Sequence, residues 1–365
     1  MRAALLEETP GELVVREVAL ADIGPDEVLV RTVACGLCHS DLHVMEGKTP
    51  HPMPSLLGHE AAGIVEAVGT DVDEFAPGDH VVGCLNAHCN RCNQCTAGRT
   101  FLCENRRALQ RRADGTSRVR RTRDGVTEEV NQMAGLGGFG EMMLAHRSAL
   151  AVVPHDLPLE LGALLGCAVI TGIGAAFNTA RVQAGSTVAV VGVGGIGLNI
   201  IQGARLAGAE RIIAIDLNAG KAALAATFGA TDFVDAGSHD PVAAVTELTT
   251  GGADTAFEAI GLASTAEQAF QMLRSGGMAY LVGLSPQGTN YQFNGNDMVI
   301  RSRGVQGVFM GSNHFKRDIP MLANLYLQGR LKLDELVSAR IPLEDINDGF
   351  HEMRTGTVAR SVVIY

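Results

Sequence analysis

The sequence is poor in aromatic residues, with no tryptophan, four tyrosines and an aromatic share of 4%. Charged residues are also sparse at 19%, and positive charge is the scarcer kind, since 29 Lys and Arg stand against 40 Asp and Glu. The formal charge of -11 would repel phosphate backbones, so nucleic acid is a poor partner. The 365 residues are 46% hydrophobic and include 44 glycines, which indicates a close-packed globular protein rather than a disordered or coiled-coil chain.

A secretory leader is not expected, because the apolar start at residues 3–6 is interrupted by Glu7 and Glu8. Two uncharged stretches, 161–177 and 182–204, are long enough to be tested against a membrane span. The second stretch carries six glycines and several polar residues, which suits a strand, a tight turn and a helix better than a lipid-facing helix. We therefore expect a cytoplasmic protein that has no membrane partner.

Hydrophobic patterning divides the chain into segments of two kinds. Up to about residue 153 the apolar runs are short and alternate with polar residues, which predicts a β-rich domain. From about residue 159 helical segments alternate with buried runs, which predicts βαβ units and a parallel sheet. The buried strands are expected at 187–191, 211–215, 232–234, 255–259 and 278–282. A helix around 319–328 and a last strand at 360–365 follow, and we expect that strand to return to the first domain.

A glycine-rich turn follows the first buried strand and opens a helix, with glycines at Gly192, Gly194, Gly195 and Gly197. In this context the glycines permit a tight turn, close approach of the backbone to a pyrophosphate and close helix packing, while the helix N-terminus supplies amide donors. Asp216 ends the next strand, nineteen residues past Gly197, where it can accept hydrogen bonds from an adenosine ribose and repel a 2′-phosphate. Lys221 can support the ribose. NAD is therefore favoured over NADP, although Asp216 could instead only cap the strand end.

Half of the eight cysteines fall within fifteen residues, at Cys89, Cys92, Cys95 and Cys103. In a cytosolic chain, closely spaced cysteines bind metal more often than they form disulfides. Four thiolates in one loop suit a closed tetrahedral zinc that leaves no position for a substrate, so this zinc would be structural. The alternative is a loop of unliganded, reactive thiols.

A second group of possible metal ligands is dispersed along the chain, at Cys38, His59 and Cys167. Each is weak evidence by itself, because a buried cysteine is usually a small hydrophobe and a lone histidine is usually structural. Together with the glycine turn and the four-cysteine loop, they resemble the zinc-dependent medium-chain alcohol dehydrogenases essentially from end to end. The likeness is to the longer-loop branch of that family, near the class III type.

The resemblance implies an α/β plus β fold, in which a GroES-like catalytic domain is interrupted by a doubly wound Rossmann domain. We place the catalytic domain with its structural-zinc loop at 1–167, the Rossmann domain at 168–311 and the return to the catalytic domain at 312–365. The resemblance also implies two zinc ions per subunit and NAD. The implied activity is hydride transfer between NAD and a primary alcohol or its aldehyde.

By resemblance, Cys38, His59 and Cys167 would hold the catalytic zinc. Asp41 would orient His59, and Glu60 would lie beside the metal. An ordinary turn residue is the alternative for Asp41, and a structural ion-pair partner is the alternative for Glu60.

A proton relay is also implied, in which Ser40 takes the alcohol proton and passes it through the cofactor ribose to His43 and solvent. Ser40 could instead cap a helix, and His43 could be an inert surface residue. A non-catalytic zinc protein of this fold would be expected to lack metal ligands, relay residues or the cofactor acid, and this sequence has all three.

Contacts to cofactor and substrate follow from the same resemblance. His39 and Arg360 match positions that contact the cofactor pyrophosphate, with plain surface cations as the alternative. Leu85 and Phe139 match positions that line the substrate channel, with core packing as the alternative. Because Leu85 stands where the family often has an aromatic residue, the inner pocket should be wider and should favour a medium-chain or aromatic alcohol.

An arginine-rich segment at 106–123 leaves two interpretations open. It is either a solvated surface loop or a cationic rim that attracts an anionic substrate or clamps a neighbouring subunit. Its first part resembles the glutathione-dependent formaldehyde dehydrogenase branch, where an arginine at the place of Arg107 binds the carboxylate of a thiol adduct. Oxidation of an S-hydroxymethyl-thiol adduct is therefore the alternative function. Thr49 and His43 stand where that branch has an acidic residue and a tyrosine, which favours an ordinary alcohol.

The expected partners are a small alcohol or aldehyde and a second copy of the chain. A hydrophobic strand near 304–310 is predicted at the edge of the cofactor domain, where it could pair across a twofold axis. We therefore expect a homodimer.

Overall fold

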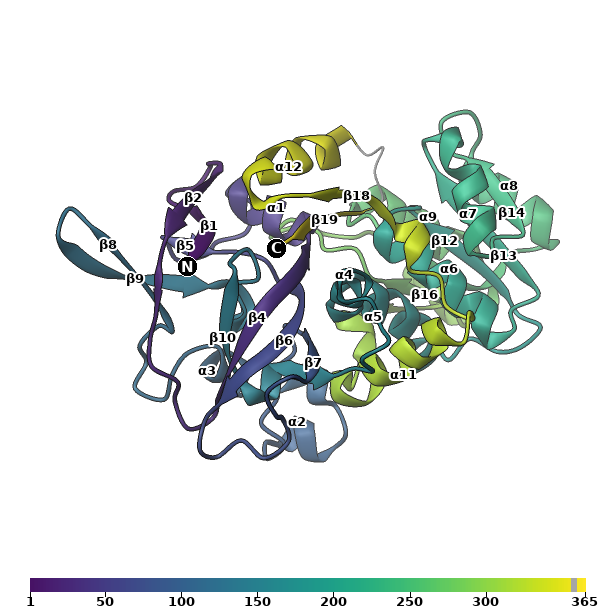
Figure 1. The fold of residues 1–365 in the computed structure, drawn as a ribbon. Helices are drawn as coiled ribbons and strands as arrows, with labels where there is room; N and C mark the ends of the chain where they lie inside the picture. The colour runs from purple at the N-terminus through teal and green to yellow at the C-terminus, as the bar shows by residue number, and fades with distance from the viewer. Residues whose placement is uncertain (356–359) are drawn as a thin grey trace. The chain divides into compact units, whose positions relative to one another are not determined.

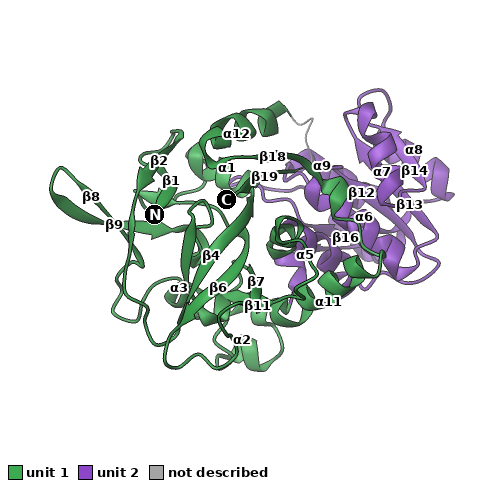
Figure 2. Ribbon diagram, viewed as in Figure 1, with its two compact units in different colours: residues 1–167, 314–365 green, residues 168–313 purple. Residues whose placement is uncertain are grey.

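The computed structural model describes residues 1–355 and 360–365, which fall into two compact units (Figure 2). Unit 1 comprises residues 1–167 and 314–365, and unit 2 comprises residues 168–313. The first boundary coincides with the domain limit expected from the sequence, and the second lies two residues beyond the expected limit of 311.

Unit 1 is built on two β-sheets (Figure 1). The first has the strand order β2-β1-β5-β9-β8-β3, and its strands are β1 (Arg2–Leu6), β2 (Leu13–Glu17), β3 (Ala19–Leu20), β5 (Ser55–Leu56), β8 (Val119–Arg123) and β9 (Val126–Gln132). The second has the order β11-β7-β6-β4-β19-β18, with β10 also paired to β4. Its strands are β4 (Glu27–Gly36), β6 (Glu60–Val68), β7 (His80–Gly83), β10 (Met142–His146), β11 (Leu150–Val152), β18 (Val337–Ile341) and β19 (Arg360–Ile364).

The last strand returns to the first domain, as expected. β19 pairs antiparallel with β4, so that Val363 lies opposite Cys35 and Val362 opposite Gly36. On the other side of β4, Gly36 lies opposite Glu60 at the start of β6. Gly36 therefore lies between the first residue of β6 and the middle of β19.

In the described part of unit 1, six α-helices accompany these sheets, namely α1 (His39–Met45), α2 (Asn93–Thr96), α3 (Arg106–Leu109), α4 (Leu159–Gly162), α11 (Phe315–Leu327) and α12 (Ile346–Thr355). The apolar faces of the strands and of α1 and α12 form one hydrophobic core. Phe139 is fully buried in it, with its ring edge-on to that of Phe350 at 5.9 Å between centroids. This core fixes the loops that carry the candidate metal ligands.

Unit 2 contains a six-stranded sheet in which every pairing is parallel, with the order β14-β13-β12-β15-β16-β17. Its strands are β12 (Thr187–Val191), β13 (Arg211–Asp216), β14 (Asp232–Asp235), β15 (Ala253–Glu258), β16 (Leu273–Leu281) and β17 (Gly304–Gly307). Its helices are α5 (Ala168–Gly174), α6 (Gly195–Ala207), α7 (Ala222–Phe228), α8 (Pro241–Thr249), α9 (Ala263–Gln271) and α10 (Gly295–Ile300). The chain runs outward from β12 to one edge and then returns to continue from β15, which is the doubly wound Rossmann order. The expected fold class is confirmed.

Within residues 1–355 and 360–365, no single helix is both long and apolar enough to cross a bilayer. One pair of helices, 159–166 and 168–179, meets that test of length and composition only when taken together, and it is bent by 53°.

Candidate metal and cofactor sites

Three segments of unit 1 bring the dispersed metal ligands together. Cys38 precedes the first residue of α1, His59 precedes β6, and Cys167 follows the short helical turn after α4. The candidate ligand atoms of these residues and of Glu60 all lie within 4.8 Å of one another, and all four residues are buried. Two sulfurs and one imidazole nitrogen at this spacing suit a zinc ion with one position left open.

Asp41 holds His59 from the side away from the metal group. His59 Nδ1 lies 3.2 Å from Asp41 Oδ2, and Asp41 Oδ1 also accepts the amide N–H of Gly58 at 3.0 Å. His59 Nε2 is buried and has no hydrogen-bond partner among the described residues. A fixed Nδ1 and an unpartnered Nε2 are what a metal-binding histidine requires, so the residues fit the zinc that the fold implies. Although burial disfavours the imidazolium, the negative charges of Asp41 and Cys38 raise the pKa of His59 well above its ordinary value.

The two cysteines of this group titrate together. A hydrogen bond from Cys167 lowers the pKa of Cys38 well below its ordinary value, and the positive charges of His59 and Arg360 act in the same direction. Donating that bond, together with burial, raises the pKa of Cys167 well above its ordinary value. The site therefore favours at least one thiolate, which is the protonation state that binds metal.

Glu60 and Arg360 form a buried pair, so the ion-pair role considered for Glu60 is present, with a partner that the sequence patterns did not predict. Arg360 Nη2 lies 3.5 Å from Glu60 Oε1, and Arg360 is only 4% exposed. The pair forms because β6 and β19 flank β4 on opposite sides and both begin near Gly36. Burial raises the pKa of Glu60 to about 8 although Arg360 opposes this shift. Arg360 is thus a buried partner of Glu60 and not a plain surface cation.

The residues expected in the proton relay lie on α1. Ser40 and His43 are half-buried and stand three residues apart, which places them on one face of the helix. His39 is exposed at the first turn of the same helix. Neither Ser40 nor the residue before α1 caps the helix with a side-chain hydrogen bond.

The two residues expected to line the substrate channel have different surroundings. Leu85 is half-buried in the loop that follows β7. Phe139 has no exposed surface and packs within the core of unit 1, which is the alternative that the sequence left open for it.

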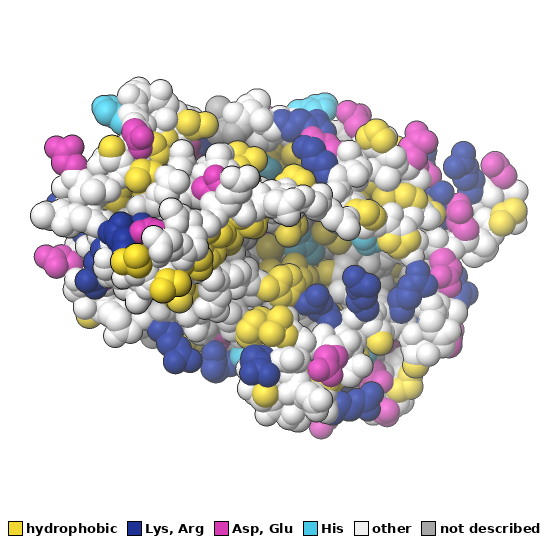
Figure 3. Space-filling model, turned by 180° about the vertical axis from the view of Figure 1, so that it is seen from behind, with side chains coloured by type: hydrophobic (Ala, Val, Ile, Leu, Met, Phe, Trp, Pro, Cys, Tyr) yellow, Lys and Arg dark blue, Asp and Glu magenta, His cyan; other side chains and the backbone are white. Residues whose placement is uncertain are grey.

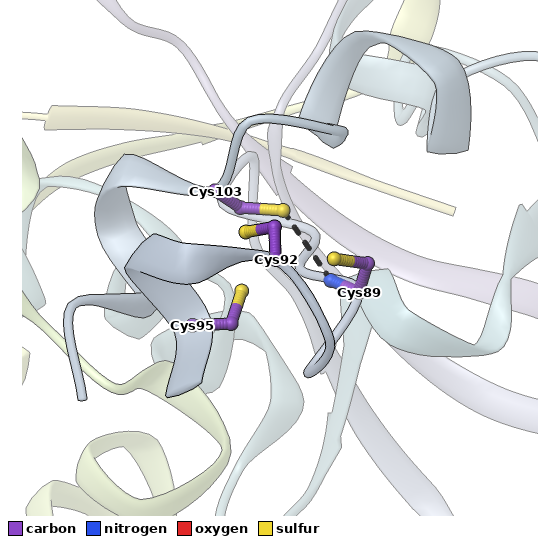
Figure 4. A group of neighbouring side chains, drawn as sticks. All are labelled: Cys89, Cys92, Cys95 and Cys103. Carbon is purple, nitrogen blue, oxygen red and sulfur yellow. Dashed lines mark hydrogen bonds between the residues drawn. The ribbon is translucent and has the colours of Figure 1, made fainter. Parts of the chain in front are cut away.

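The four closely spaced cysteines converge in one loop of unit 1 (Figure 4). Their sulfur atoms lie within 4.8 Å of one another, close to the separation of about 3.8 Å that tetrahedral Zn–S bonds impose. Cys92 and Cys95 are buried at the two ends of the first turn of α2, and Cys103 accepts the amide N–H of Cys89 at 3.4 Å. The four donors fit a closed zinc site.

Cys89 is the only half-exposed member of that cluster. Although its partial burial acts in the opposite direction, hydrogen bonds from Asn105 and from the amides of Arg91 and Cys92 lower the pKa of Cys89 to about 6. Asn105 Nδ2 lies 3.3 Å from Cys89 Sγ. The sequence patterns did not single out Asn105, because a lone asparagine after the last cysteine carries no recognisable signal.

The glycine turn of unit 2 has the geometry of a dinucleotide site. Gly192 has a positive φ of 97°, which only glycine adopts without strain. A Cβ on Gly197 would lie 1.8 Å from the carbonyl oxygen of Gly192, so glycine is required there for close packing of α6. A Cβ on Gly194 would meet open space, where a pyrophosphate can approach the N-terminus of α6. The residues therefore fit the dinucleotide that the fold implies.

Asp216 lies beside this turn at the carboxyl end of β13. Its Oδ2 accepts the amide N–H of Val193 at 2.8 Å and lies 3.0 Å from Lys221 Nζ. Its Oδ1 accepts the amide N–H of Asn218 at 3.0 Å. Asp216 therefore caps the strand end and is also placed next to the glycine turn, so the two roles considered for it are compatible.

The arginine-rich segment 106–123 is not a simple solvated loop, and that expectation is wrong for several of its residues. The segment forms α3 and then enters the β8–β9 hairpin (Figure 1). Arg118 is 1% exposed, with Nε 2.7 Å from Glu27 Oε1, and Arg112 Nη2 lies 2.8 Å from Glu27 Oε2. Carboxylates on other strands thus fold these guanidinium groups inward. Arg107 stays exposed on α3.

Basic side chains do not form one continuous surface on the face shown in Figure 3. There the Lys and Arg side chains occur in small groups that alternate with acidic and uncharged ones.

The fold and the donor sets together define a zinc-binding oxidoreductase that uses a nicotinamide dinucleotide. Comparison with known families supports this class directly. Residues 24–155 match the alcohol dehydrogenase GroES-like domain, and residues 195–324 match the zinc-binding dehydrogenase domain.

Individual relatives cover nearly the whole chain. An alcohol dehydrogenase class-3 from Zea mays is 36% identical over 370 residues, which are 99% of this chain and 96% of the relative. An S-(hydroxymethyl)glutathione dehydrogenase from Paracoccus denitrificans is 36% identical over 376 residues, which are 100% and 99% of the two chains. The crystal structure of benzyl alcohol dehydrogenase from Acinetobacter calcoaceticus has a TM-score of 0.94 at 32% identity and covers 100% of this chain and 98% of that chain. The chain belongs to the zinc-dependent medium-chain alcohol dehydrogenase family, near class III, and its cofactors are zinc and NAD.

Proposed function

We propose that this enzyme transfers hydride between NAD and a primary medium-chain or aromatic alcohol, with the aldehyde reduction as its reverse reaction. The observation that carries the proposal is the buried group of Cys38, His59 and Cys167, whose atoms converge within 4.8 Å while Asp41 fixes the imidazole. The likeness to a benzyl alcohol dehydrogenase supports the aromatic part of the substrate range.

In this proposal Cys38, His59 and Cys167 hold the catalytic zinc. When bound, the zinc supplies a Lewis acid that makes an alcohol oxygen more acidic near neutral pH. Asp41 keeps His59 Nδ1 protonated, so that Nε2 presents its lone pair to the metal. Glu60 belongs to the same buried group, and Arg360 at 3.5 Å compensates its charge when it is ionised.

The proton of the alcohol leaves along α1. Ser40 accepts it at Oγ, and His43, one helical turn further and half-exposed, releases it from its ring to solvent. Leu85 contributes an apolar wall that excludes water from the substrate.

NAD would supply the hydride acceptor. The glycine turn and the N-terminus of α6 would hold its pyrophosphate. His39, exposed on α1, stays a predicted pyrophosphate contact, whereas Arg360 is buried against Glu60. Asp216 and Lys221 receive the ribose hydroxyls.

We expect Asp216→Ala to weaken NAD use about tenfold and to improve NADP relative to NAD, because a ribose acceptor and a repelling charge are both lost. Steady-state kinetics with the two cofactors measure this ratio. Asp235→Ala, a change at the end of the neighbouring strand β14, is the matched control and should leave the ratio unchanged. Equal use of both cofactors by the wild type would contradict the assignment.

A second candidate function is oxidation of an S-hydroxymethyl-thiol adduct. It is favoured by the similarity to the class-3 alcohol dehydrogenase from Zea mays and the S-(hydroxymethyl)glutathione dehydrogenase from Paracoccus denitrificans. Arg107 is exposed on α3 and available for the carboxylate of such an adduct. Thr49, where that branch has an acidic residue, and His43, where it has a tyrosine, weigh against it.

Kinetics on ethanol, hexanol, benzyl alcohol and S-hydroxymethylglutathione distinguish the two functions. We expect kcat/KM to rise from ethanol to hexanol and benzyl alcohol, since each buried methylene contributes roughly 10- to 200-fold selectivity at most. A kcat/KM that is highest for the thiol adduct and is lowered by Arg107→Ala would establish the second function instead.

A homodimer in the cytoplasm completes the proposal. β17 is an edge strand of the sheet in unit 2, and Val299 and Ile300 on the preceding helix α10 are 79% and 73% exposed. An unpaired strand edge beside exposed apolar side chains suits pairing across a twofold axis. All eight cysteines lie in the described residues and none forms a disulfide, which suits a reducing compartment. A stable monomer in light scattering would refute the proposed dimer.

A further inference from the structure

Glu258 in unit 2 is a buried carboxylate that the proposed function does not use. It is the last residue of β15 and is only 1% exposed. In the part of the chain that the structure describes, no cationic side chain forms an ion pair with it. A buried ionised group is costly unless hydrogen bonds compensate it, so the partners of Glu258 indicate what it does.

Three donors converge on one oxygen of this carboxylate. Glu258 Oε1 accepts the amide N–H of Ile260 at 2.9 Å and the amide N–H of Gly261 at 2.7 Å. It also accepts the hydroxyl of Thr265 at 2.8 Å. Thr265 stands in the first turn of α9, so the carboxylate ties the loop after β15 to the start of that helix. Each of these bonds is stronger when the acceptor is charged, so the ionised carboxylate holds the loop best.

The loop that Glu258 holds lies against the glycine turn. β15 pairs with β12, and beyond the paired residues the amide N–H of Ala259 donates to the carbonyl oxygen of Val191 at 2.9 Å. A Cβ on Gly192 would lie 2.6 Å from Ile260 Cγ1. The Ile260 side chain therefore packs directly on the first glycine of the turn.

Apolar side chains are exposed at this end of the sheet. Ile260 is 45% exposed, and Leu262 in the same loop and Leu284 after β16 are exposed as well. The two segments are in close contact, because a Cβ on Gly261 would lie 2.5 Å from the carbonyl oxygen of Leu284. The chain reverses its winding direction between β12 and β15, and a doubly wound sheet binds its ligand outside the carboxyl ends of the strands at such a point. The exposed face of Ile260 is therefore available to a dinucleotide.

We propose that Glu258 is a positioning residue for NAD, and that its charge fixes the loop after β15 so that Ile260 meets the bound dinucleotide beside Gly192. The proposal rests on the proposed function, because it assumes that NAD binds at the glycine turn. Glu258 itself does not touch the cofactor and acts through two amides and the Thr265 hydroxyl. A loop that is fixed in advance loses less conformational freedom on binding, so Glu258 tunes cofactor affinity and not the chemical step.

Glu258→Gln separates the charge of this group from its shape. The amide oxygen can still accept the three bonds, but an uncharged acceptor holds them less strongly. We expect the Kd for NADH, measured from nicotinamide fluorescence on the zinc-loaded enzyme, and the KM for NAD to rise about tenfold. The kcat should not fall by more than about twofold, since no group that contacts the reacting atoms is altered.

Asp254→Asn is the matched control. Asp254 lies near the other end of β15, where its carboxylate also accepts a backbone amide, that of Thr187 at 2.8 Å. This variant should bind NADH with wild-type affinity, and the unfolding midpoints of both variants report any general loss of stability. Equal NADH affinity in the wild type and Glu258→Gln, or an equal loss in both variants, would overturn the proposal. A wild type that binds no NADH would refute the proposed function and this proposal with it.

Thr265 variants provide a second test that does not depend on the folding of Glu258→Gln. Thr265→Val removes one of the three donors and leaves the charge, so the Kd for NADH should rise about threefold. Thr265→Ser retains the hydroxyl and should bind NADH as the wild type does. Wild-type affinity in Thr265→Val would overturn the proposal.

Ile260→Ala tests whether Glu258 acts through Ile260. In the Ile260→Ala background, Glu258→Gln should weaken NADH binding by no more than about twofold, because the side chain that the carboxylate positions is already absent. The same loss in both backgrounds would overturn the proposal.

Deuterium exchange without cofactor gives a readout that is independent of activity. In Glu258→Gln the amides of Ile260 and Gly261 should exchange faster than in the wild type, while Asp254→Asn should leave them unchanged. Unchanged exchange at these two amides in Glu258→Gln would overturn the proposal, since the charge would then not hold the loop.

Discussion

The two cysteine-containing groups of unit 1 are assembled in different ways. The four cysteines of the closed cluster come from residues 89–103, and a single helical turn with its flanking amides brings them together. The other group takes Cys38, His59 and Cys167 from segments more than a hundred residues apart at the extremes, and only the folded core brings them within 4.8 Å. A local group can therefore fold together with its metal, whereas the dispersed group requires the finished domain.

The two groups also differ in the charge of their neighbouring side chains and in their burial. Behind the dispersed group lies a layer of charged side chains, with Asp41 on His59 and Arg360 on Glu60, and every member is buried. Behind the closed cluster lie backbone amides and Asn105, and Cys89 is half-exposed. The comparison supports the proposal that the first group performs the chemistry and the second contributes to stability.

Cys38→Ser should have the largest effect on activity. Serine is a poor zinc ligand, so the variant should contain one zinc instead of two and lose about a thousandfold or more in kcat/KM, the loss expected when a Lewis acid worth several kcal/mol is removed. Elemental analysis and kinetics on benzyl alcohol measure both quantities. Cys84→Ser, at a buried cysteine outside both groups, is the control and should retain two zinc ions. An active wild type with a single zinc would refute the assignment.

Cys92→Ser should have the opposite effect, a large loss of stability and a smaller loss of activity. Structural zinc contributes directly to folding, so we expect the loss of several kcal/mol in the free energy of unfolding together with the loss of the other zinc. Activity measured at low temperature, before unfolding, should fall far less than in Cys38→Ser. Denaturant unfolding and metal analysis test this contrast. Equal losses of activity in the two variants would refute the division into a catalytic and a structural zinc.

The sequence predicted the parts of this contrast that depend on local order. Each of these local features spans no more than about fifteen residues of sequence. The strand expected at 187–191 is β12, its glycine turn leads into α6, and the four closely spaced cysteines lie together in one loop. The hydrophobic period changes near residue 159, and the limit at Cys167, where unit 1 is divided, came only with the family resemblance.

Contacts that depend on strand pairing could not be predicted. Glu60 and Arg360 meet because each strand begins beside Gly36, and no local pattern states which strands are neighbours. From sequence, Arg112 and Arg118 were compatible with a solvated surface loop. Both side chains instead turn toward Glu27, because β4 places its carboxylate beside them. Buried ion pairs between distant segments have no periodic signature.

Asp41→Asn tests whether charge behind His59 matters at the dispersed group. The amide can still accept from His59 Nδ1, but it carries no charge, and loss of such an orienting carboxylate typically weakens metal binding or activity about 10- to 100-fold. We expect a zinc affinity lower by that factor at the dispersed site and no change at the closed cluster. Competition with a chelator measures the two sites separately. Asp124→Asn at the exposed tip of the β8–β9 hairpin is the control, and equal behaviour of the two variants would leave Asp41 with a turn role only.

Asn105→Ala tests the closed cluster and should have the smallest effect. The Asn105 side chain donates one hydrogen bond to Cys89 Sγ. A hydrogen bond to a charged acceptor contributes about 1.5 to 3 kcal/mol, and less at a half-exposed sulfur. We therefore expect zinc to leave the cluster several-fold faster in the variant, with kcat/KM unchanged within about twofold.

Asn93→Ala is the matched control, because Asn93 is an exposed asparagine of the same loop whose side chain does not hold a sulfur. If Asn105→Ala lowered kcat/KM as strongly as Asp41→Asn while zinc release stayed at the wild-type rate, the four-cysteine cluster would be coupled to the reaction. The separation of stability from chemistry between the two groups would then fail. If only zinc release changes, the neutral donor behind Cys89 serves to retain the metal, whereas the carboxylate behind His59 also sets its reactivity.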